Sequence, residues 1–247
     1  MIKRVALIPA RKGSKRLENK NIKILNGHPL IAYSIVSAIN SGLFSNVICA
    51  TDSEEYAKIA LKYGALVPEL RKNNISEDVS PDIDWVKWIL NLLENRGNSY
   101  DQFAILRPTS PFRTSDTIKR AFKEFNMNPS FDSLRAVEKC KQHPGKMWKL
   151  YGDFITPILP YYIDETPWHS SQYSNLPEIF VQNACIEIAN TTVIKNFNSI
   201  SGNRIKPFFT NPIEGIDINS LDDWEKVENI LSKDKTIIEK INLKTNT

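Results

Sequence analysis

The chain has 247 residues and a formal net charge of +4, and 41% of its residues are hydrophobic and 24% charged. These values are typical of a globular protein and exclude collagen-like, disordered and disulfide-scaffold classes. No apolar run approaches the roughly 18 residues of a membrane span, and the apolar stretch from Val5 to Ala10 is too short for a signal peptide. Three scattered cysteines favour a reducing compartment, so we expect a cytoplasmic protein without membrane or nucleic-acid partners.

Strands and helices alternate along most of the chain. Val5 to Ile8 is a short apolar run of the kind that is buried on both faces of a sheet. We expect strands at 5–8, 47–50, 103–106, 133–137, 185–188 and 215–218. We expect helices at 29–42, 54–63, about 85–93, 115–125 and 220–231. This alternation predicts an α/β fold with right-handed crossovers, in a single domain that spans residues 1–247.

The regular pattern breaks down between about 141 and 182, where the sequence is rich in proline and large aromatic residues. Short alternating pieces such as 153–158 indicate a hairpin. Large aromatic side chains without a helical or strand period need a surface against which they can be buried. We therefore expect an inserted arm in this region, with a second copy of the chain as its partner.

A strongly basic loop follows the first predicted strand. Its positive charges fall at Arg11, Lys12, Lys15, Arg16, Lys20 and Lys23. Gly13 lets the backbone approach a ligand closely, and Ser14 adds a hydroxyl donor. Ligands of open α/β sheets bind beyond the carboxyl ends of the strands, so the loop is a candidate polyphosphate site; the alternative is a solvated basic loop. Neither GxGxxG nor GxxxxGKS/T occurs, which argues against a dinucleotide fold or a P-loop.

The segment PARKGSKRLENKN at 9–21, followed by NGHPLIAYSI, resembles the first signature of the acylneuraminate cytidylyltransferases, also called CMP-sialic acid synthetases. Further matches follow in order along nearly the whole chain, among them ATDS at 50–53, LRPTSPFRT at 106–114, HPGK at 143–146 and GIDI at 215–218. The resemblance implies a three-layer, Rossmann-like fold of the nucleotide-diphospho-sugar-transferase type, with a mixed, mostly parallel sheet and an inserted dimerisation arm.

The resemblance also implies a reaction. CMP would pass from CTP to the anomeric hydroxyl of a 2-keto-3-deoxy sugar acid, with Mg²⁺ as cofactor, pyrophosphate as product and a role in lipopolysaccharide or capsule biosynthesis. The expected CTP-binding residues are Ala10, Arg11, Gly13, Ser14, Lys15, Lys20, Asn21 and Arg71, and the expected catalytic residues are Arg11, Lys15, Lys20 and Asp217. Among the CTP-binding residues, the family pattern places Asn21 and Arg71 at the base and ribose.

Two further sets of residues are expected from the resemblance and from residue chemistry. Sugar-binding residues are Arg107, Lys146, Tyr173 and Asn183, and metal ligands are Asp217 and Asn219. Asp217 follows a predicted strand as a hard-oxygen ligand should, although an Asp that caps the following turn is an alternative. This chain departs from the family pattern at several of these positions and their neighbours: Asn219 replaces an Asp, Arg107 a Gln, Tyr173 an Arg, Ala184 a Gly and Glu187 a Tyr.

The sequence leaves several functions open. Within the family, the sugar could be N-acetylneuraminate, another nine-carbon acid such as legionaminate or pseudaminate, or an eight-carbon Kdo-type acid. A nucleotidyltransferase for a sugar 1-phosphate is a second enzyme class, although the longer Gly-rich loop usual there is absent. A catalytically silent nucleotide-binding protein is a third possibility, suggested by Asn219 and the altered sugar-side residues. The residues identify no general base.

Overall fold

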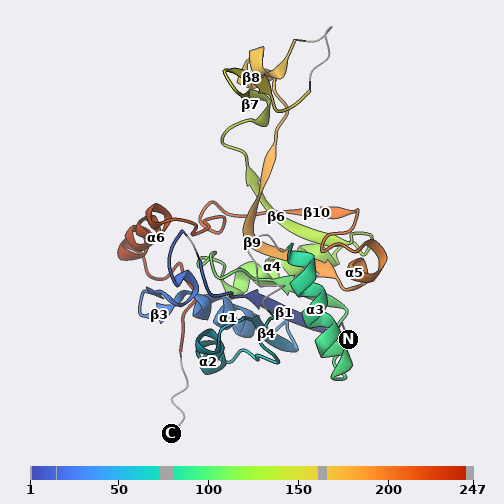
Figure 1. Ribbon diagram of the computed structural model, residues 1–247, viewed down its shortest axis with the longest axis vertical. Coiled ribbons are helices and arrows are strands. Elements are labelled where there is room, and N and C mark those ends of the chain that lie inside the picture. Colours follow the sequence, from blue (N-terminus) through green and yellow to red (C-terminus); the bar gives the residue numbers. More distant parts are fainter. Residues whose placement is uncertain (1, 15, 73–80, 161–165, 243–247) are drawn as a thin grey trace.

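The computed structural model describes residues 2–14, 16–72, 81–160 and 166–242. Its centre is a mixed sheet with strand order β10-β6-β9-β5-β1-β4 (Figure 1). These strands are β1 (Arg4–Pro9), β4 (Asn46–Ala50), β5 (Gln102–Ile105), β6 (Ser133–Lys139), β9 (Phe180–Asn190) and β10 (Ile205–Phe209). β9 runs antiparallel to its neighbours β5 and β6, and the other pairs are parallel. The predicted mixed, mostly parallel sheet is confirmed.

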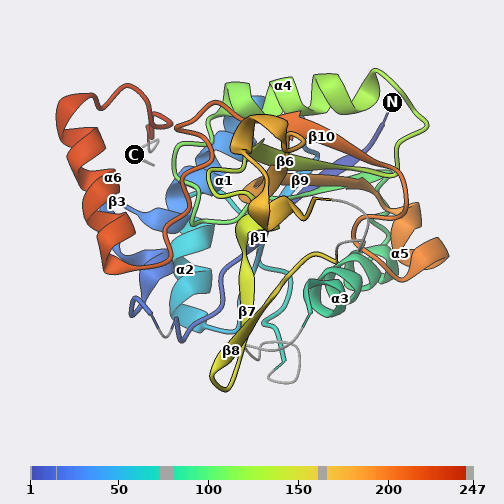
Figure 2. The ribbon, with the colours of Figure 1, turned by 90° about the horizontal axis from the view of Figure 1, so that it is seen from above.

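Helices cover both faces of the sheet, which gives the expected three layers (Figure 2). They are α1 (Leu30–Ser41), α2 (Glu54–Lys62), α3 (Asp82–Asn95), α4 (Ser115–Asn126), α5 (Thr192–Phe197) and α6 (Leu221–Lys233). A short two-stranded ribbon of β2 (Ile24–Leu25) and β3 (His28–Pro29) precedes α1. No helix in the described ranges is long and apolar enough to cross a membrane.

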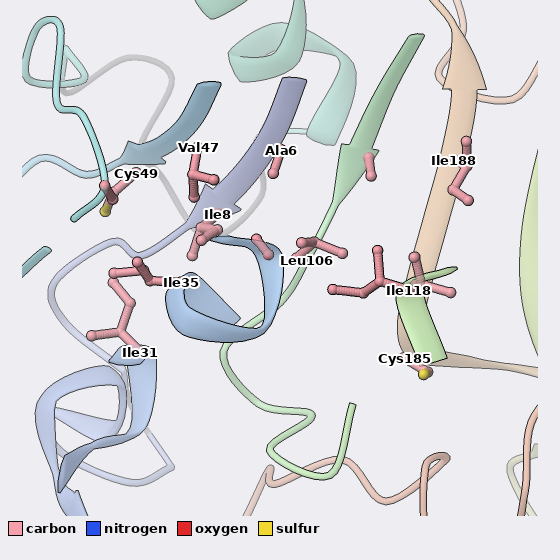
Figure 3. Packing of buried hydrophobic residues seen from close by; sticks show 14 of the residues in the cluster. Ala6, Ile8, Ile31, Ile35, Val47, Cys49, Leu106, Ile118, Cys185 and Ile188 are labelled. Atoms are coloured by element: carbon pink, nitrogen blue, oxygen red, sulfur yellow. The ribbon is translucent and has the colours of Figure 1, made fainter. Parts of the chain in front are cut away.

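Alternate side chains of β1 enter different layers of the core. Ala6 and Ile8 belong to the cluster formed with α1, α2 and α4, part of which is drawn in Figure 3. Val5 and Leu7 belong to the cluster formed with α3 and α5. All four side chains are fully buried, which explains why this strand is a continuous apolar run rather than an alternating one.

Local signals mark the starts of α2, α4 and α6 and the end of α1. Ser53 Oγ accepts the N–H of Tyr56 at the start of α2, and Thr114 and Ser220 form capping boxes at the starts of α4 and α6. Gly42 ends α1 with φ at 67°, a left-handed conformation that glycine adopts without the steric cost of a Cβ. Capping side chains therefore mark where α2, α4 and α6 begin.

The strand predicted at 215–218 is wrong. This segment is a loop in which Ile218 N–H donates to Thr109 O. The apolar side chain of Ile218 packs in a core cluster together with residues of α6. The strand at that end of the sheet is β10, which includes Pro207. Proline is tolerated there because β10 is an edge strand with β6 as its one sheet neighbour. Asp217 consequently lies in a loop and does not end a strand.

The chain between β6 and β9 projects away from the sheet as an arm (Figure 1). β7 (Trp148–Tyr151) and β8 (Phe154–Pro157) pair antiparallel within it, so the hairpin expected in this region is confirmed. Several of its apolar side chains remain accessible, with exposed fractions of 69% for Leu150, 60% for Phe154 and 53% for Ile155. Such a set of exposed apolar side chains is typical of a surface that contacts another protein.

Candidate active site

The carboxyl ends of β1, β4 and β5 meet at one edge of the sheet, because these strands are parallel neighbours. The segments that follow them contribute to a cavity of about 260 Å³. We call it the cationic cavity; it is lined by Pro9, Arg11, Ser14, Lys20, Asn21, Arg71, Asp82, Trp85, Arg107, Pro108 and Thr109. Four of these side chains are cations and one is a carboxylate, a balance that suits a ligand with several negative charges.

Hydrogen bonds hold the loop after β1 against the end of β4. Ala10 N–H donates to Ala50 O over 3.0 Å, and Lys12 N–H donates to Asp52 Oδ1 over 2.8 Å. The Ala10 side chain is buried in the core, so neither this side chain nor its N–H is available to a ligand in the cavity. Lys15, an expected CTP-binding and catalytic residue, lies outside the described residues.

The same loop contains two further expected CTP-binding residues. Gly13 has φ at 88°, a backbone conformation that other residues adopt only with strain, and it is not among the lining residues of the cavity. Asn21 lines the cavity, and its Nδ2 donates to Arg11 O over 3.2 Å. Gly13 thus shapes the loop, whereas Asn21 links the loop back to Arg11 at the lining of the cationic cavity.

Lys20 connects this loop to the C-terminal part of the chain. Its Nζ donates to Ile218 O over 2.7 Å. Burial lowers the pKa of Lys20, and the nearby charge of Asp217 partly offsets that effect. An ammonium group with reduced hydration interacts strongly with an anionic ligand, because the surrounding dielectric is low.

Arg71 reaches the cationic cavity from the segment after β4. The backbone N–H of Arg71 donates to Thr51 O over 2.7 Å, which fixes the backbone beside β4. The guanidinium carbon lies 5.5 Å from the ring centre of Trp85, and burial lowers the pKa of Arg71. Trp85 is both buried and part of the cavity lining.

A second cavity, of about 420 Å³, adjoins the first. We call it the acidic cavity; it is lined by Arg107, Glu138, Val181, Gln182, Asn183, Ala184, Glu187 and Asp217. It contains three carboxylates and, among its described lining residues, one cation. That cation, Arg107, also lines the cationic cavity and is the one residue common to both linings.

Two carboxylates from distant parts of the chain hold Arg107. Its Nη2 donates to Asp82 Oδ2 over 2.5 Å and to Glu187 Oε1 over 2.7 Å. Burial alone would lower the pKa of Arg107, but the charges of Glu187 and Asp82 outweigh burial and raise it. Arg107 therefore stays charged, and a sugar carboxylate that approached it would compete with two carboxylates of the protein.

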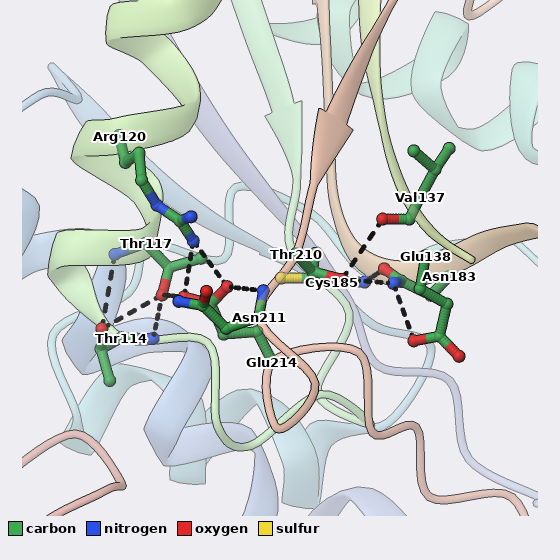
Figure 4. Close-up of polar contacts among 10 residues, drawn as sticks. All are labelled: Thr114, Thr117, Arg120, Val137, Glu138, Asn183, Cys185, Thr210, Asn211 and Glu214. Carbon is green, nitrogen blue, oxygen red and sulfur yellow. Dashed lines mark hydrogen bonds and ion pairs between the residues drawn. The ribbon is translucent and has the colours of Figure 1, made fainter. Parts of the chain in front are cut away.

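Asn183 lines the acidic cavity, and Figure 4 shows its contacts. Its Nδ2 donates to Thr210 Oγ1 over 2.9 Å and lies 3.4 Å from Glu138 Oε2, while its Oδ1 accepts the N–H of Cys185 over 3.2 Å. Gly215 approaches the same group so closely that a Cβ there would lie 2.1 Å from Glu138 Oε2. A side chain at this position would displace the Glu138 carboxylate and crowd the Asn183 amide.

The loop before α6 supplies the expected metal ligands. Asn219 Nδ2 donates to Asp217 Oδ2 over 2.5 Å, and Asp217 Oδ1 is buried without a hydrogen-bond partner among the described residues. An orphaned carboxylate oxygen fits Mg²⁺, which proteins bind through one or two carboxylates together with substrate phosphates. Asn219 contacts Asp217 through its nitrogen and so orients the carboxylate. The described residues contain no cluster of three or more His, Cys, Asp or Glu side chains suited to a metal ion.

Lys146 and Tyr173 lie in the arm and line neither cavity of their own chain. Lys146 Nζ donates to the carbonyl oxygens of His169 and Ser171, and it lies 5.5 Å from the ring centre of Tyr173. The two residues expected to bind the sugar are therefore close to each other. The fold of one chain does not bring them to Asn183 and Arg107.

Three charged lining residues, Asp82, Glu138 and Glu187, were absent from the expected site. Asp82 begins α3 directly after Pro81, and a helix start near the carboxyl edge of the sheet is a position from which it could have been suspected. Glu138 lies within β6, where nothing in the local sequence distinguishes a cavity residue from a solvent-facing one. Glu138 and Glu187 reach the site because the sheet places β6 beside β9, and Asp82 reaches it from the start of α3.

Comparison with known proteins gives consistent findings. The family model described as cytidylyltransferase matches residues 5–144. The chain is 33% identical over 230 residues to the CMP-N,N′-diacetyllegionaminic acid synthase of Legionella pneumophila, which covers 92% of this chain and 95% of that protein. It is 40% identical over 137 residues to the pseudaminic acid cytidylyltransferase of Campylobacter jejuni, which covers 56% of this chain and 59% of that protein.

A solved structure described as CMP:2-keto-3-deoxy-manno-octonic acid synthetase complexed with CTP has a TM-score of 0.66 to this chain at 16% identity, covering 94% of this chain and 99% of the other. That likeness supports the fold alone. The family match and the Legionella relative together establish that the chain belongs to the cytidylyltransferase family, a class of nucleotidyltransferases. Within this class it is a member of the CMP-sialic-acid-synthetase-like group, as the resemblance of its first signature predicts.

Proposed function

We propose that this enzyme transfers CMP from CTP to the anomeric hydroxyl of a nine-carbon 2-keto-3-deoxy sugar acid and releases pyrophosphate, for the biosynthesis of a surface glycan such as lipopolysaccharide or capsule. The observation that carries this proposal is the junction of a cationic cavity with an acidic one at Arg107. A triphosphate is matched by the charges of Arg11 and Lys20, and Ser14 adds a hydroxyl donor. Arg71 and Asn21 line the same cavity and are assigned to the nucleoside.

The acidic cavity suits the sugar. Carboxylates accept hydrogen bonds from sugar hydroxyl and amide N–H groups, and the Asn183 side chain supplies both a donor and an acceptor. Relatives named for N,N′-diacetyllegionaminic acid and pseudaminic acid favour a nine-carbon acid over the eight-carbon Kdo type. The assay described below distinguishes the nine-carbon acids, which differ in their substituents.

A Mg²⁺ requirement is part of the proposal. Asp217 would hold the ion through its orphaned Oδ1, with Asn219 steadying the carboxylate. When bound, the ion supplies neutralisation of the phosphate charges. Lys20 and Arg11 then bind and orient the triphosphate from the opposite loop. Replacement of Asp217 by Asn should weaken the Mg²⁺ dependence of CTP binding, measured by calorimetry over a series of Mg²⁺ concentrations.

We also propose that the enzyme forms a homodimer through the arm. The hairpin exposes Leu150, Phe154 and Ile155, which a second copy would cover. Lys146 and Tyr173 line neither cavity of their own chain, so a role for them at the sugar requires the arm of the second copy to approach the acidic cavity. Sedimentation velocity tests the dimer directly.

A single assay tests the transfer reaction. The protein is incubated with Mg²⁺, each of the four NTPs and a panel of N-acetylneuraminate, N,N′-diacetyllegionaminate, pseudaminate and Kdo, and pyrophosphate is measured. Release with CTP and one or more nine-carbon acids is the expected result. CTP binding without release with any acid would support a silent nucleotide-binding homologue instead, and release with Kdo alone would support the eight-carbon alternative.

A further inference from the structure

Arg107 occupies a position that no other described lining residue shares. The cationic cavity is assigned to CTP, the acidic cavity with Asn183 is assigned to the sugar, and Arg107 belongs to both linings. In the proposed reaction the sugar hydroxyl must approach the α-phosphorus of CTP from the sugar side. The reacting atoms therefore meet where the two cavities join, which is where Arg107 lies.

The side chain is anchored by one of its nitrogens and keeps the others available. Both described hydrogen bonds use Nη2, to Asp82 and to Glu187. No described residue accepts a hydrogen bond from its Nη1 or Nε, and 29% of the side chain remains exposed. A guanidinium has five N–H donors in a planar fork, so an anchored Nη2 leaves three donors that match phosphate oxygens.

The two anchoring carboxylates are themselves fixed. Asp82 Oδ1 accepts from Trp85 Nε1 over 2.7 Å, so the carboxylate cannot turn away from Arg107 without losing this bond. Glu187 Oε2 lies 3.3 Å from Arg135 Nε, and the Glu187 side chain is 5% exposed. A buried carboxylate with two cationic partners is held in position by both contacts. The orientation of the Arg107 guanidinium is consequently determined from both cavities.

We propose that Arg107 is a catalytic residue that contacts the α-phosphoryl group during its transfer, and that Asp82 and Glu187 are positioning residues that hold its guanidinium at the junction of the two cavities. This inference rests on the proposed function. In the step, the anomeric oxygen forms a bond to the α-phosphorus while the bond from that phosphorus to the β-bridging oxygen breaks. The electron pair leaves with pyrophosphate, which also carries away the hydroxyl proton. Arg107 donates hydrogen bonds to the non-bridging α-oxygens.

This role differs from binding of the sugar carboxylate, and the kinetic consequences differ too. A group that contacts the α-phosphoryl mainly in the transition state lowers kcat when it is removed and leaves substrate binding nearly intact. A group that binds the sugar carboxylate equally in ground and transition states raises the sugar KM and leaves kcat unchanged. The split between these two parameters therefore separates the two roles.

The experiment compares wild type with Arg107→Gln, using CTP, Mg²⁺ and whichever acid of the four-member panel the wild type uses. We expect kcat to fall about 100- to 1000-fold, the range for loss of one preorganised donor, while the sugar KM and the calorimetric Kd for CTP change less than about threefold. Arg96→Gln is the matched control, because Arg96 pairs with Glu69 at the surface and lines neither cavity. A raised sugar KM with unchanged kcat would overturn the proposal.

A double-mutant cycle tests the positioning residues. Glu187→Ala should lower kcat, Glu187→Gln should restore part of it because its amide oxygen still accepts from Nη2, and Glu187→Ala should have little further effect in the Arg107→Gln background. Additive losses in kcat would show that Glu187 does not act through Arg107. The same cycle with Asp82→Asn and Asp82→Ala tests the other carboxylate that holds Arg107.

Absence of turnover in the wild type with every acid overturns the proposed function and this inference together. Normal wild-type turnover with additive losses overturns only the positioning role.

Discussion

The cationic and acidic cavities share Arg107, yet the chain builds them in different ways. The cationic cavity takes Arg11, Lys20 and Arg71 from the segments that follow β1 and β4. The acidic cavity takes its three carboxylates from β6, β9 and the loop before α6. The first cavity is thus assembled largely from strand ends, and the second forms only when distant segments are brought side by side. Substitutions in the two cavities should therefore separate the binding of CTP from the use of the sugar.

The largest expected effect is in the cationic cavity. Lys20→Ala removes a cation with reduced hydration that also bonds Ile218 O, and we expect kcat/KM for CTP to fall about 1000-fold or more. The measurement is steady-state pyrophosphate release with the folded state checked by circular dichroism. Lys23→Ala is the matched control, because Lys23 belongs to the same basic loop but lies over the Trp224 ring and lines neither cavity. Near-normal turnover in Lys20→Ala would remove Lys20 from the site.

The second prediction breaks the acidic cavity alone. Gly215→Ala places a Cβ 2.1 Å from Glu138 Oε2 and 2.9 Å from Asn183 Nδ2, so both side chains must move. We expect the sugar KM to rise about 10- to 100-fold, a loss of two polar contacts, while the Kd for CTP stays within about threefold. Calorimetry with CTP and kinetics with the sugar give the two values. Equal losses for both substrates would show that the two cavities are not separable.

The third prediction concerns the homodimer proposed to form through the arm. A charge at an interface position costs several kcal/mol when it is buried, so Leu150→Asp combined with Ile155→Asp should convert a dimer to a monomer. Both residues are exposed on the hairpin, which means that the fold of the single chain should tolerate the change. Sedimentation velocity measures the mass, with Leu221→Asp on the exposed start of α6 as the control. A monomeric wild type would contradict the role given to the arm.

The smallest effect is on the loop that carries Asp217. Asp223 accepts the N–H groups of Asn219 and Ser220, and these bonds outweigh burial and lower the pKa of its carboxyl group. Asp223→Asn should lower the free energy of unfolding by about 1 kcal/mol at neutral pH, as for other capping residues. Because the folded-state pKa is the lower one, this stabilisation is fully present above the unfolded-state pKa and disappears as the pH falls through the folded-state value. Urea unfolding of both proteins between pH 7 and about pH 3 measures the difference, which should shrink with acidity. A constant difference would exclude the charge of Asp223 as its cause.

Elements with local signals were predicted well. The strand expected at 5–8 and the helices expected at 29–42, 54–63, 115–125 and 220–231 depend on neighbouring residues, and the structure has each of them close to the expected bounds. The strand expected at 215–218 failed because an apolar alternation also suits a loop that packs on a helix. β10 escaped prediction because an edge strand tolerates the proline that normally argues against a strand.

By itself, the amino-acid sequence determined the α/β class, the basic loop after the first strand and membership of the cytidylyltransferase family, because each depends on local patterns or on short motifs. Only the tertiary structure decided which groups face Arg107. Asp82 and Glu187 lie 25 and 80 residues away from it, and their contacts exist because α3, β5 and β9 come together at one edge of the sheet. Contacts of this kind depend on strand order and register, which no local pattern encodes.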